Sequence, residues 1–452
     1  MTTSNKEPNK RKKLFGTDGI RSRVGQFPLD DPSVRRLGFS LASLPNALKI
    51  VIGSDTRASG KTIANCLTAG IQAANPDARV STCGVIPTPG LSYITSNHDF
   101  DYGIMITASH NPYTDNGIKI FHHTGEKLPD AMEVQLESYF FSLKNDIVFK
   151  QAEEPIHIGG ELYYEFLKSH IDGLADTGYK VVLDCAHGAT YETAPRLFAE
   201  TGLDVTVTHA APDGRNINRD CGSTHMDRLS TLVSKAGADL GIGFDGDGDR
   251  VLFVDRSGNL LDGDYVLLML ARYFKQTRTD FNSIVVGTVM GNLGLEKKLT
   301  AEGFQYLRTG VGDKQVYQEM KQKDALIGGE QSGHTILKCF GVTGDGILTA
   351  LYFLRALSYL GIRPEAAFGQ LELFPQVICN IDVKEKKSLD DWPQLTEMSD
   401  RFEADYADNS RLLIRYSGTE PKLRIMMESR HQSIIQTNLN KFEQLIRSTI
   451  GK

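Results

Sequence analysis

The chain has 452 residues, 40% hydrophobic and 23% charged, with a formal net charge of −6. These values are ordinary for a globular protein, and the length predicts about three domains. The negative charge argues against a nucleic-acid partner, and the apolar runs are too short to predict a membrane span or a secretion signal. The six scattered cysteines form no Cys-x-x-Cys pair, which predicts reduced thiols in a cytoplasmic protein.

The N-terminal part begins with a basic run, Lys10–Lys13, which we interpret as a solvated tail. The segment Leu14–Arg21 follows, with two glycines around Thr17 and Asp18. It predicts a turn that brings backbone N–H groups and Arg21 to one side, where they would suit a phosphate or carboxylate. An ordinary turn is the alternative.

Leu48–Gly53 predicts a strand, and the segment after it ends in Gly60-Lys-Thr62 like a phosphate-binding P-loop. The first glycine of that motif would fall at Asp55, whose carboxylate would oppose a nucleotide phosphate. We therefore reject a P-loop and expect a structural strand–helix turn with an internal ion pair between Asp55 and Arg57.

A serine loop follows the apolar run Tyr102–Ile106, which predicts a buried strand. Ser109 stands where this strand ends, and two turn signals that contain asparagine, Asn111-Pro112 and Asn116-Gly117, follow it. His110 and Lys119 supply proton-transfer and cationic groups. The segment lacks Gly-x-Ser-x-Gly, so an esterase elbow does not fit, and a polar loop with a chance serine remains the alternative.

Strands are predicted again at Lys180–Asp184, Ala238–Phe244 and Val251–Val254. The glycines from Gly241 to Gly246 match a dinucleotide-binding pattern. A strand and not a helix follows them, so we reject that interpretation.

Three aspartates, Asp245, Asp247 and Asp249, alternate with glycines between two of these strands. Carboxylates this close repel one another unless a cation gathers them, and oxygen ligands select Mg2+ or Ca2+. An EF-hand fails because Arg250 and Arg256 occupy the positions of its glycine and glutamate. The pattern predicts a Mg2+ site with open positions for a substrate phosphate, and a solvated acidic turn is the alternative.

The segment Ala325–His334 carries a third polar loop. Glu330, Ser332 and His334 alternate with other residues, so on an extended segment they would face one side and suit a polyol ligand. A capped turn is the alternative. A strongly apolar helix is predicted at Leu348–Leu360.

The last part predicts two strands, Arg411–Arg415 and Lys422–Met427, and a closing amphipathic helix. The turn between the strands carries hydroxyls and exposed backbone N–H groups, flanked by two arginines. Such a turn suits an anion, while a polar hairpin turn is the alternative. The residues of this predicted cradle are Arg415, Ser417, Gly418, Thr419 and Arg424.

The loops near Ser109, Asp245 and Glu330 are about evenly spaced, which suggests triplication of one α/β unit. We expect an α/β fold with three similar domains at 1–159, 160–258 and 259–372, and a smaller α+β domain at 373–452. A serine, a hard cation, a sugar-like ligand and a distant phosphate together fit phosphoryl transfer.

Four of these segments resemble the signature loops of the α-D-phosphohexomutases, in the family's order along nearly the whole chain. They are Thr107-Ala-Ser-His-Asn-Pro112, Asp245-Gly-Asp-Gly-Asp-Arg250, Gly329-Glu-Gln-Ser-Gly-His334 and Arg415-x-Ser-Gly-Thr-Glu-Pro421. The third loop, with Phe15–Arg21 and Thr343–Gly346, is most similar to the bacterial branch that acts on glucosamine phosphates.

The resemblance implies four domains around a central cleft and interconversion of glucosamine 6-phosphate and glucosamine 1-phosphate for UDP-N-acetylglucosamine and cell-wall synthesis. It implies a phosphorylated Ser109 and glucosamine 1,6-bisphosphate as intermediate and activator. One Mg2+ per subunit would be bound by Ser109 and the three aspartates. Lys119, His110 and Arg21 would surround the transferring group, with Lys119 as proton acceptor. Glu330, Ser332 and, less centrally, His334 would hold the sugar, and the cradle residues would hold the other phosphate.

The sequence departs from the family's usual pattern at three positions. Ser22 replaces a glycine, Lys314 replaces an arginine, and Tyr416 is bulkier than the usual residue. None of these changes removes a catalytic group. Two other functions stay open: a sibling mutase acting on glucose or mannose phosphate, and a binding protein without turnover. The expected partner is a small sugar phosphate, with neither nucleic acid nor membrane, and the expected state is a monomer or homodimer.

Overall fold

The computed structural model describes residues 14–144, 147–150, 152–389, 391–417 and 421–451. It has two compact units. The first comprises Met1–Val289 with Leu307–Phe368, and the second Met290–Tyr306 with Gly369–Lys452. All six cysteines lie within the described ranges and are free thiols. Among the described helices, none has the length and apolar character needed to span a membrane.

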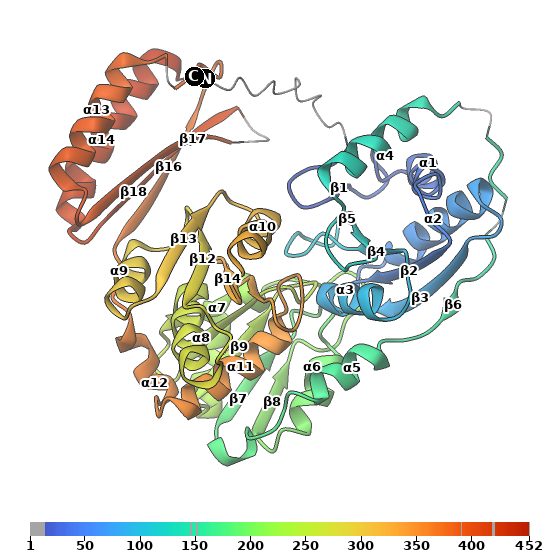
Figure 1. The fold of residues 1–452 in the computed structure, drawn as a ribbon, viewed down its shortest axis with the longest axis horizontal. Helices are drawn as coiled ribbons and strands as arrows, with labels where there is room; N and C mark the ends of the chain where they lie inside the picture. Colours follow the sequence, from blue (N-terminus) through green and yellow to red (C-terminus); the bar gives the residue numbers. More distant parts are fainter. Residues whose placement is uncertain (1–13, 145–146, 151, 390, 418–420, 452) are drawn as a thin grey trace. The chain divides into compact units, whose positions relative to one another are not determined.

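Within the described residues, the first sheet of unit one has six strands (Figure 1). In order across the sheet its strands are β1 (Ile20–Arg23), β5 (Asp115–His122), β4 (Tyr102–Ile106), β2 (Lys49–Ser54), β3 (Arg79–Val85) and β6 (Ile156–His157). Its helices are α1 (Asp31–Leu41), α2 (Gly60–Ala74), α3 (Thr88–Asn97) and α4 (Asp130–Ser142). Every residue of β4 is buried, as its continuous apolar sequence predicts.

The second sheet has the order β11 (Leu260–Leu261), β10 (Val251–Asp255), β9 (Leu240–Phe244), β7 (Lys180–Asp184) and β8 (Asp204–Thr208). Helices α5 (Glu161–Lys168), α6 (Thr193–Ala199) and α7 (Met226–Ala236) accompany it. β9 is followed directly by its antiparallel neighbour β10. The glycines of β9 therefore lead into a strand, and the rejection of a dinucleotide-binding loop is confirmed.

The third sheet has the order β13 (Gln305–Thr309), β12 (Ile284–Thr288), β14 (Ile327–Gly329) and β15 (Thr335–Leu337). Its helices are α8 (Gly263–Thr277), α10 (Asp313–Lys323), α11 (Gly346–Tyr359) and the short α12 (Pro364–Ala367). Single 3-10 turns occur at Ala175–Thr177, Gly222–Thr224 and Phe368–Gln370.

The three sheets repeat one arrangement. Each contains an antiparallel pair of consecutive strands, β4 with β5, β9 with β10 and β14 with β15. The first strand of each pair also lies beside an earlier parallel strand, β2, β7 or β12. Each of the three polar loops joins the strands of such a pair, so the three loops occupy the same place in three similar units.

The second unit contains α9 (Leu293–Ala301) and an antiparallel sheet of β16 (Gln376–Asp382), β18 (Lys422–Ser429) and β17 (Ser410–Tyr416). Helices α13 (Pro393–Tyr406) and α14 (Gln432–Ile450) pack on it through a separate apolar core that includes Trp392, Ile425 and Phe442. The predicted strands and closing amphipathic helix are thus present.

Candidate active site

Ser109 is held in place through its backbone. It has a φ of 51°, in the left-handed region, directly after β4. Its carbonyl oxygen accepts from Arg57 Nη2 at 3.0 Å and Asn218 Nδ2 at 2.8 Å. Its N–H donates to Thr107 Oγ1 at 2.9 Å. These contacts fix a strained conformation that would otherwise cost free energy, and they aim the side chain at the aspartate loop.

The pair Asp55–Arg57 underlies this arrangement. Arg57 Nε lies 2.9 Å from Asp55 Oδ2, and both side chains are fully buried. The same carboxylate oxygen accepts from Thr107 Oγ1 at 2.6 Å. Burial raises the pKa of Asp55, against the effect of Arg57 and Thr107. The predicted structural strand–helix turn with an internal ion pair is present. Arg57 also links this turn to the serine loop, because it donates to the Ser109 carbonyl.

The hydroxyl of Ser109 connects two loops that are distant in the sequence. Ser109 Oγ donates to Asp245 Oδ2 at 2.7 Å, and His110 Nδ1 lies 3.3 Å from Ser109 Oγ. Burial lowers the pKa of His110, and the nearby Arg250 and Arg21 lower it further. The predicted serine, histidine and first aspartate therefore meet at one point.

The three predicted metal ligands converge. One carboxylate oxygen from each of Asp245, Asp247 and Asp249 lies within 4.8 Å of the others, and all three side chains are buried. Burial and the two neighbouring carboxylates raise the pKa of Asp245 well above its usual range. Asp247 Oδ1 and Asp249 Oδ1 are buried and accept no hydrogen bond. Clustered, under-coordinated carboxylate oxygens are the donor set of a hard divalent cation, so these residues fit Mg2+.

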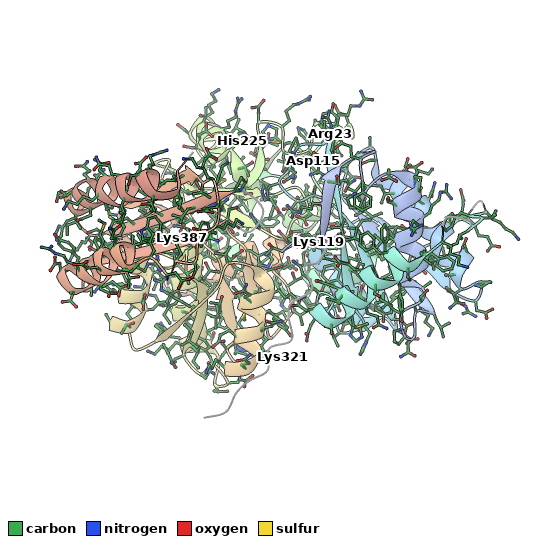
Figure 2. The ribbon with its side chains drawn as sticks, turned by 90° about the horizontal axis from the view of Figure 1, so that it is seen from above. Arg23, Asp115, Lys119, His225, Lys321 and Lys387 are labelled. Atoms are coloured by element: carbon green, nitrogen blue, oxygen red, sulfur yellow. The ribbon has the colours of Figure 1, made fainter. Side chains whose placement is uncertain are left out.

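Lys119, labelled in Figure 2, is buried in the first unit. Its Nζ is 2.9 Å from Asp247 Oδ2, 3.1 Å from Asp249 Oδ2 and 3.3 Å from Asp18 Oδ2. Burial opposes its charge, but the three carboxylates outweigh burial and raise its pKa well above the usual value. Lys119 is therefore a buried ammonium that holds three carboxylates from two loops.

Three further ion pairs extend from this cluster. Arg21 pairs with Asp18, and Lys127 pairs with both Asp18 and Asp313. Burial opposes ionisation of Asp18, yet Lys119, Lys127 and Arg21 hold its pKa well below the usual range. Sequence reasoning selected Arg21 but missed the other three residues. Asp18 could have been predicted from the sequence, because it belongs to the same turn as Arg21. The position of Lys127 is shown only by the fold.

Thr88 is another residue that sequence reasoning missed. It begins α3, and its Oγ1 donates to Asp247 Oδ2 at 2.6 Å while its N–H donates to the Asp247 carbonyl at 2.8 Å. Arg250 closes the same loop, since its N–H donates to Asp245 Oδ1 at 3.2 Å and its Nε lies 3.9 Å from Asp249 Oδ1.

The third loop corrects one expectation. Glu330, Ser332 and His334 do not lie on an extended segment, because Gln331 and Ser332 form the turn of a hairpin between β14 and β15. Gly333 has a φ of 93°, and Glu330 N–H donates to the His334 carbonyl at 2.9 Å. The single-residue alternation misled the prediction, since a tight hairpin turn places its glycine in a conformation that no strand has.

Glu330, Ser332 and His334 consequently differ in their exposure to solvent. His334 is 2% exposed, with Nδ1 3.8 Å from Asp249 Oδ2 and Nε2 accepting from Gly344 N–H at 3.0 Å. Burial opposes protonation of His334, but Asp249 and Asp313 raise its pKa overall. Glu330 is half-buried and Ser332 is exposed. Only these last two can reach a ligand directly.

Lys314 joins parts of unit one. Its Nζ donates to the Leu128 carbonyl at 2.7 Å and to Asp130 Oδ1 at 2.6 Å, and it lies 3.2 Å from Glu133 Oε1. It thereby connects α10 of the third sheet to the start of α4 beside the first sheet. The lysine that replaces the usual arginine at this position therefore makes a contact within the chain.

The second unit carries part of the predicted phosphate cradle. Arg415 in β17 lies directly opposite Arg424 in β18. Burial lowers the pKa of Arg415, and Arg424 lowers it further. Like charges opposed across two strands destabilise a sheet unless an anion joins them. Ser417 N–H donates to the Lys422 carbonyl at 2.8 Å, next to the last pair of β17 and β18. Gly418 and Thr419 lie outside the described residues.

Comparison with known proteins agrees with this geometry. Four domain families of the phosphoglucomutase/phosphomannomutase group match in order: α/β/α domain I at residues 12–146, domain II at 161–258, domain III at 262–372 and the C-terminal domain at 379–442. The chain therefore belongs to the phosphoglucomutase/phosphomannomutase family, the α-D-phosphohexomutases. The predicted family, its four-domain α/β architecture and its character as an enzyme are confirmed.

The curated relatives described here are phosphoglucosamine mutases. The chain is 41% identical to the phosphoglucosamine mutase of Solibacter usitatus over 449 residues, which covers 98% of this chain and 100% of the relative. It is 41% identical to the phosphoglucosamine mutase of Pseudomonas syringae pv. tomato, with 96% of this chain and 98% of the relative covered.

Solved structures share the fold. A phosphoglucomutase/phosphomannomutase family protein from Burkholderia thailandensis aligns with a TM-score of 0.77 at 21% identity, covering 97% of this chain and 99% of that one. Aspergillus fumigatus N-acetylphosphoglucosamine mutase, in complex with GlcNAc-6P and magnesium, aligns with a TM-score of 0.65 at 17% identity, covering 97% and 96%.

Proposed function

We propose that the chain is a phosphoglucosamine mutase of the cytoplasm, which interconverts glucosamine 6-phosphate and glucosamine 1-phosphate. The observation that carries the proposal is the convergence of Ser109 with three buried carboxylates and Lys119. The identity of about 41% with curated phosphoglucosamine mutases over nearly the whole chain supports the choice of substrate.

Ser109 is the proposed carrier of the phosphoryl group. The bond from its Oγ to phosphorus would break as a sugar hydroxyl oxygen bonds to the same phosphorus, giving glucosamine 1,6-bisphosphate. The hydroxyl proton leaves the sugar, and the serine oxygen gains a proton. When the bisphosphate has turned round, its other phosphate returns to Ser109 by the reverse step. Each step needs positioning and charge neutralisation more than covalent chemistry by the protein.

The aspartate loop is the proposed Mg2+ site, with Asp245, Asp247, Asp249 and the phosphorylated Ser109 as ligands. A solved relative contains magnesium together with GlcNAc-6P, which supports this choice of ion. When bound, Mg2+ would neutralise charge on the transferring phosphoryl group. Lys119 supplies a fixed positive charge beside Asp247 and Asp249, and Arg21 pairs with Asp18, which also contacts Lys119. The role of Lys119 as proton acceptor stays a prediction.

Glu330 and Ser332 are the proposed sugar contacts. The sugar must bind in two orientations, so its recognition has to rest on hydroxyls that stay within reach after it turns. Glu330 Oε1 already accepts from Gly312 N–H at 3.3 Å, which orients the carboxylate. We see no other carboxylate in this loop for a C2 ammonium, so discrimination at C2 should be modest.

A coupled assay across glucosamine, glucose and mannose phosphates tests the function, with each sugar's own bisphosphate supplied as activator. We expect glucosamine phosphate to be preferred, with kcat/KM for glucose phosphate about 10- to 1000-fold lower. Equal or better efficiency on glucose or mannose phosphate would make the chain a sibling mutase. No turnover of any of the three, with Ser109 intact, would favour a binding protein without catalysis.

A further inference from the structure

Lys127 is a largely buried lysine that has no role in the proposed reaction. Its side chain is 12% exposed, and its Nζ forms ion pairs with Asp18 and Asp313. Removing an ammonium from water costs free energy unless carboxylates receive it. The two carboxylates that receive this one come from different parts of unit one, the turn around Arg21 and the start of α10.

The backbone around Lys127 belongs to a tight hairpin, residues 122–128, that directly follows β5. His122 N–H donates to the Glu126 carbonyl at 2.9 Å. Leu128 N–H donates to the Ile120 carbonyl, also at 2.9 Å. These bonds on both sides of Lys127 fix the base of its side chain, so its ammonium reaches Asp18 from a rigid support.

The carboxylate of Asp18 is shared by three cations. Lys127 pairs with Asp18 Oδ1, whereas Lys119 Nζ lies 3.3 Å from Oδ2 and Arg21 pairs with Oδ2 as well. Arginine commonly binds a carboxylate through both of its oxygens at once. Because Lys127 occupies Oδ1, Asp18 holds Arg21 through one oxygen only.

These contacts form a line of alternating charges that crosses unit one. Lys119 Nζ lies 3.1 Å from Asp249 Oδ2 in the aspartate loop, and Lys127 ends the line on the first residue of α10. The members, in order, are Asp249, Lys119, Asp18, Lys127 and Asp313. The line therefore connects all three sheets of the unit and passes through the carboxylate that Arg21 contacts.

Attachment of α10 to the hairpin does not depend on Lys127 alone. Lys314 Nζ donates to a hairpin carbonyl, that of Leu128, at 2.7 Å. Lys321 Nζ lies 2.7 Å from Glu126 Oε1. Both of these contacts join the same helix to the same hairpin. Loss of the Lys127 ammonium would thus leave α10 attached, while Asp18 would lose the partner of one oxygen.

We propose that Lys127 is a positioning residue for phosphoryl transfer and that it acts through Asp18. By occupying one oxygen of Asp18, it prevents this carboxylate from closing on Arg21 through both oxygens. The guanidinium of Arg21 and the ammonium of Lys119 then keep positive charge available for the phosphoryl group that leaves Ser109. This inference rests on the proposed function. The ion pairs of Lys127 among the described residues reach Asp18 and not the aspartate loop itself.

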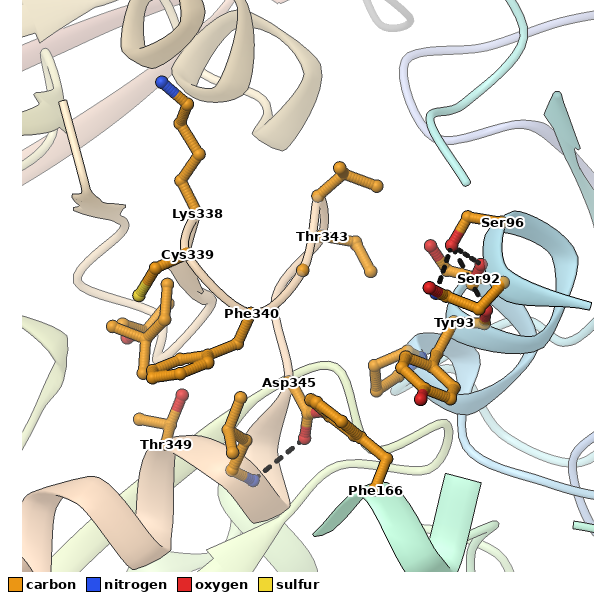
Figure 3. Close-up of a pocket in the computed structure, with 17 residues that line it drawn as sticks. Ser92, Tyr93, Ser96, Phe166, Lys338, Cys339, Phe340, Thr343, Asp345 and Thr349 are labelled. Carbon is orange, nitrogen blue, oxygen red and sulfur yellow. Dashed lines mark hydrogen bonds between the residues drawn. The ribbon is translucent and has the colours of Figure 1, made fainter. Parts of the chain in front are cut away.

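The test uses two changes of Lys127 and a matched control. Lys127→Met keeps an unbranched side chain and removes its charge, and Lys127→Arg keeps the charge. A cavity of about 110 Å3, lined by Lys127, Asp313 and Thr343 among others, gives room for the larger guanidinium. Thr343, labelled in Figure 3, also lines the larger cavity drawn there. Lys321→Met is the control, since it removes the other lysine pair between α10 and the hairpin without touching Asp18.

We expect kcat of Lys127→Met to fall about 10- to 100-fold, with KM for glucosamine 6-phosphate changed by less than about twofold, because the loss concerns charge in the transition state. Lys127→Arg should recover most of this loss, and Lys321→Met should match wild type. In a protein that already carries Asp18→Asn, Lys127→Met should cost less than about threefold, since its effect passes through that carboxylate.

Hydrogen exchange of the amides of Gly16–Ile20, followed by mass spectrometry, gives a readout that is independent of turnover. Lys127→Met should speed this exchange, because the turn loses the restraint on Asp18, and Lys321→Met should not. Wild-type kcat in Lys127→Met, an equal loss in Lys321→Met, an undiminished cost in the Asp18→Asn background, or unchanged exchange would each overturn the proposal. Failure of the proposed function would show instead as a wild type that converts none of the sugar phosphates. The exchange rates would then decide alone whether Lys127 positions Asp18.

Discussion

Ser109 Oγ donates a 2.7 Å hydrogen bond to Asp245 Oδ2, although 136 positions separate the two residues. The bond joins two loops that occupy the same place in two similar sheets, after β4 and after β9. The third equivalent loop, after β14, brings His334 to Asp249. Three repeated units thus contribute one loop each to one cluster, and each loop has a different residue type at its tip. This division lets one repeated framework hold a serine, three converging carboxylates and a buried histidine.

The first prediction concerns the nucleophile. Ser109→Ala should abolish turnover and also remove the phosphate that we expect on a fraction of the purified protein, because no other group at this position can carry it. Intact-protein mass spectrometry and the coupled assay measure both effects. Ser43→Ala, an exposed serine that bonds only the Phe39 carbonyl, is the control and should change neither. Wild-type activity in Ser109→Ala would refute the phosphoserine mechanism.

The second prediction concerns the cation. Asp247→Asn keeps the shape of a fully buried side chain and removes one of three converging charges. We expect weaker Mg2+ binding in isothermal titration and a large fall in kcat. Asp220→Asn removes a carboxylate that pairs with Arg228 at the surface, where ion pairs contribute little, so it should behave like wild type. Unchanged Mg2+ affinity in Asp247→Asn would count against the assignment of the aspartate loop.

The third prediction concerns the phosphate that does not react. Arg415→Ala should remove charge-assisted hydrogen bonds worth roughly 1.5–3 kcal/mol, or about 10- to 100-fold in kcat/KM. Both directions of the reaction should slow, since we expect each phosphate of the sugar to occupy the cradle in turn. Arg401→Ala, on the exposed surface of α13, is the matched control. A defect in one direction only, at fixed bisphosphate, would contradict a shared cradle.

The sequence predicts much of this fold because its central strands are short and apolar and end in polar loops. The run Tyr102–Ile106 and the strands around the aspartate loop were recognisable for that reason. The convergence of the three carboxylates was also predictable, since Asp245, Asp247 and Asp249 are close in sequence and need only a bend to converge.

Contacts between distant segments were not predictable in the same way. Thr88 reaches Asp247 across 159 positions, and nothing in the local sequence of α3 marks it as a partner of the aspartate loop. Lys127 and Asp313 meet only because α10 lies near the hairpin after β5. The turn at Glu330–His334 was misjudged for a different reason: alternation of polar residues over five positions does not distinguish a strand from a hairpin whose glycine has a positive φ.

The last prediction concerns pH and stability. Burial raises the pKa of Asp345 from the ordinary 3.8 to about 6, against the effect of hydrogen bonds from Leu348 N–H and the Tyr163 hydroxyl. The folded protein therefore binds this proton more tightly than the unfolded chain does. Stability from this group is fully present below about pH 4 and is lost as the pH rises to about 6, by roughly 3 kcal/mol at most.

Asp345→Asn should remove this contribution and keep the cap of α11, because asparagine caps a helix about as well as aspartate. Wild type should therefore lose stability relative to the variant between pH 4 and pH 6.5, and the two curves should run parallel above that range. Differential scanning calorimetry of both proteins across this range measures the difference. Asp400→Asn, in α13 of the second unit, is the control and should follow wild type throughout. If the Asp345→Asn and wild-type melting temperatures stay a constant distance apart from pH 4 to pH 6.5, the carboxyl of Asp345 titrates near its ordinary value and burial does not govern it.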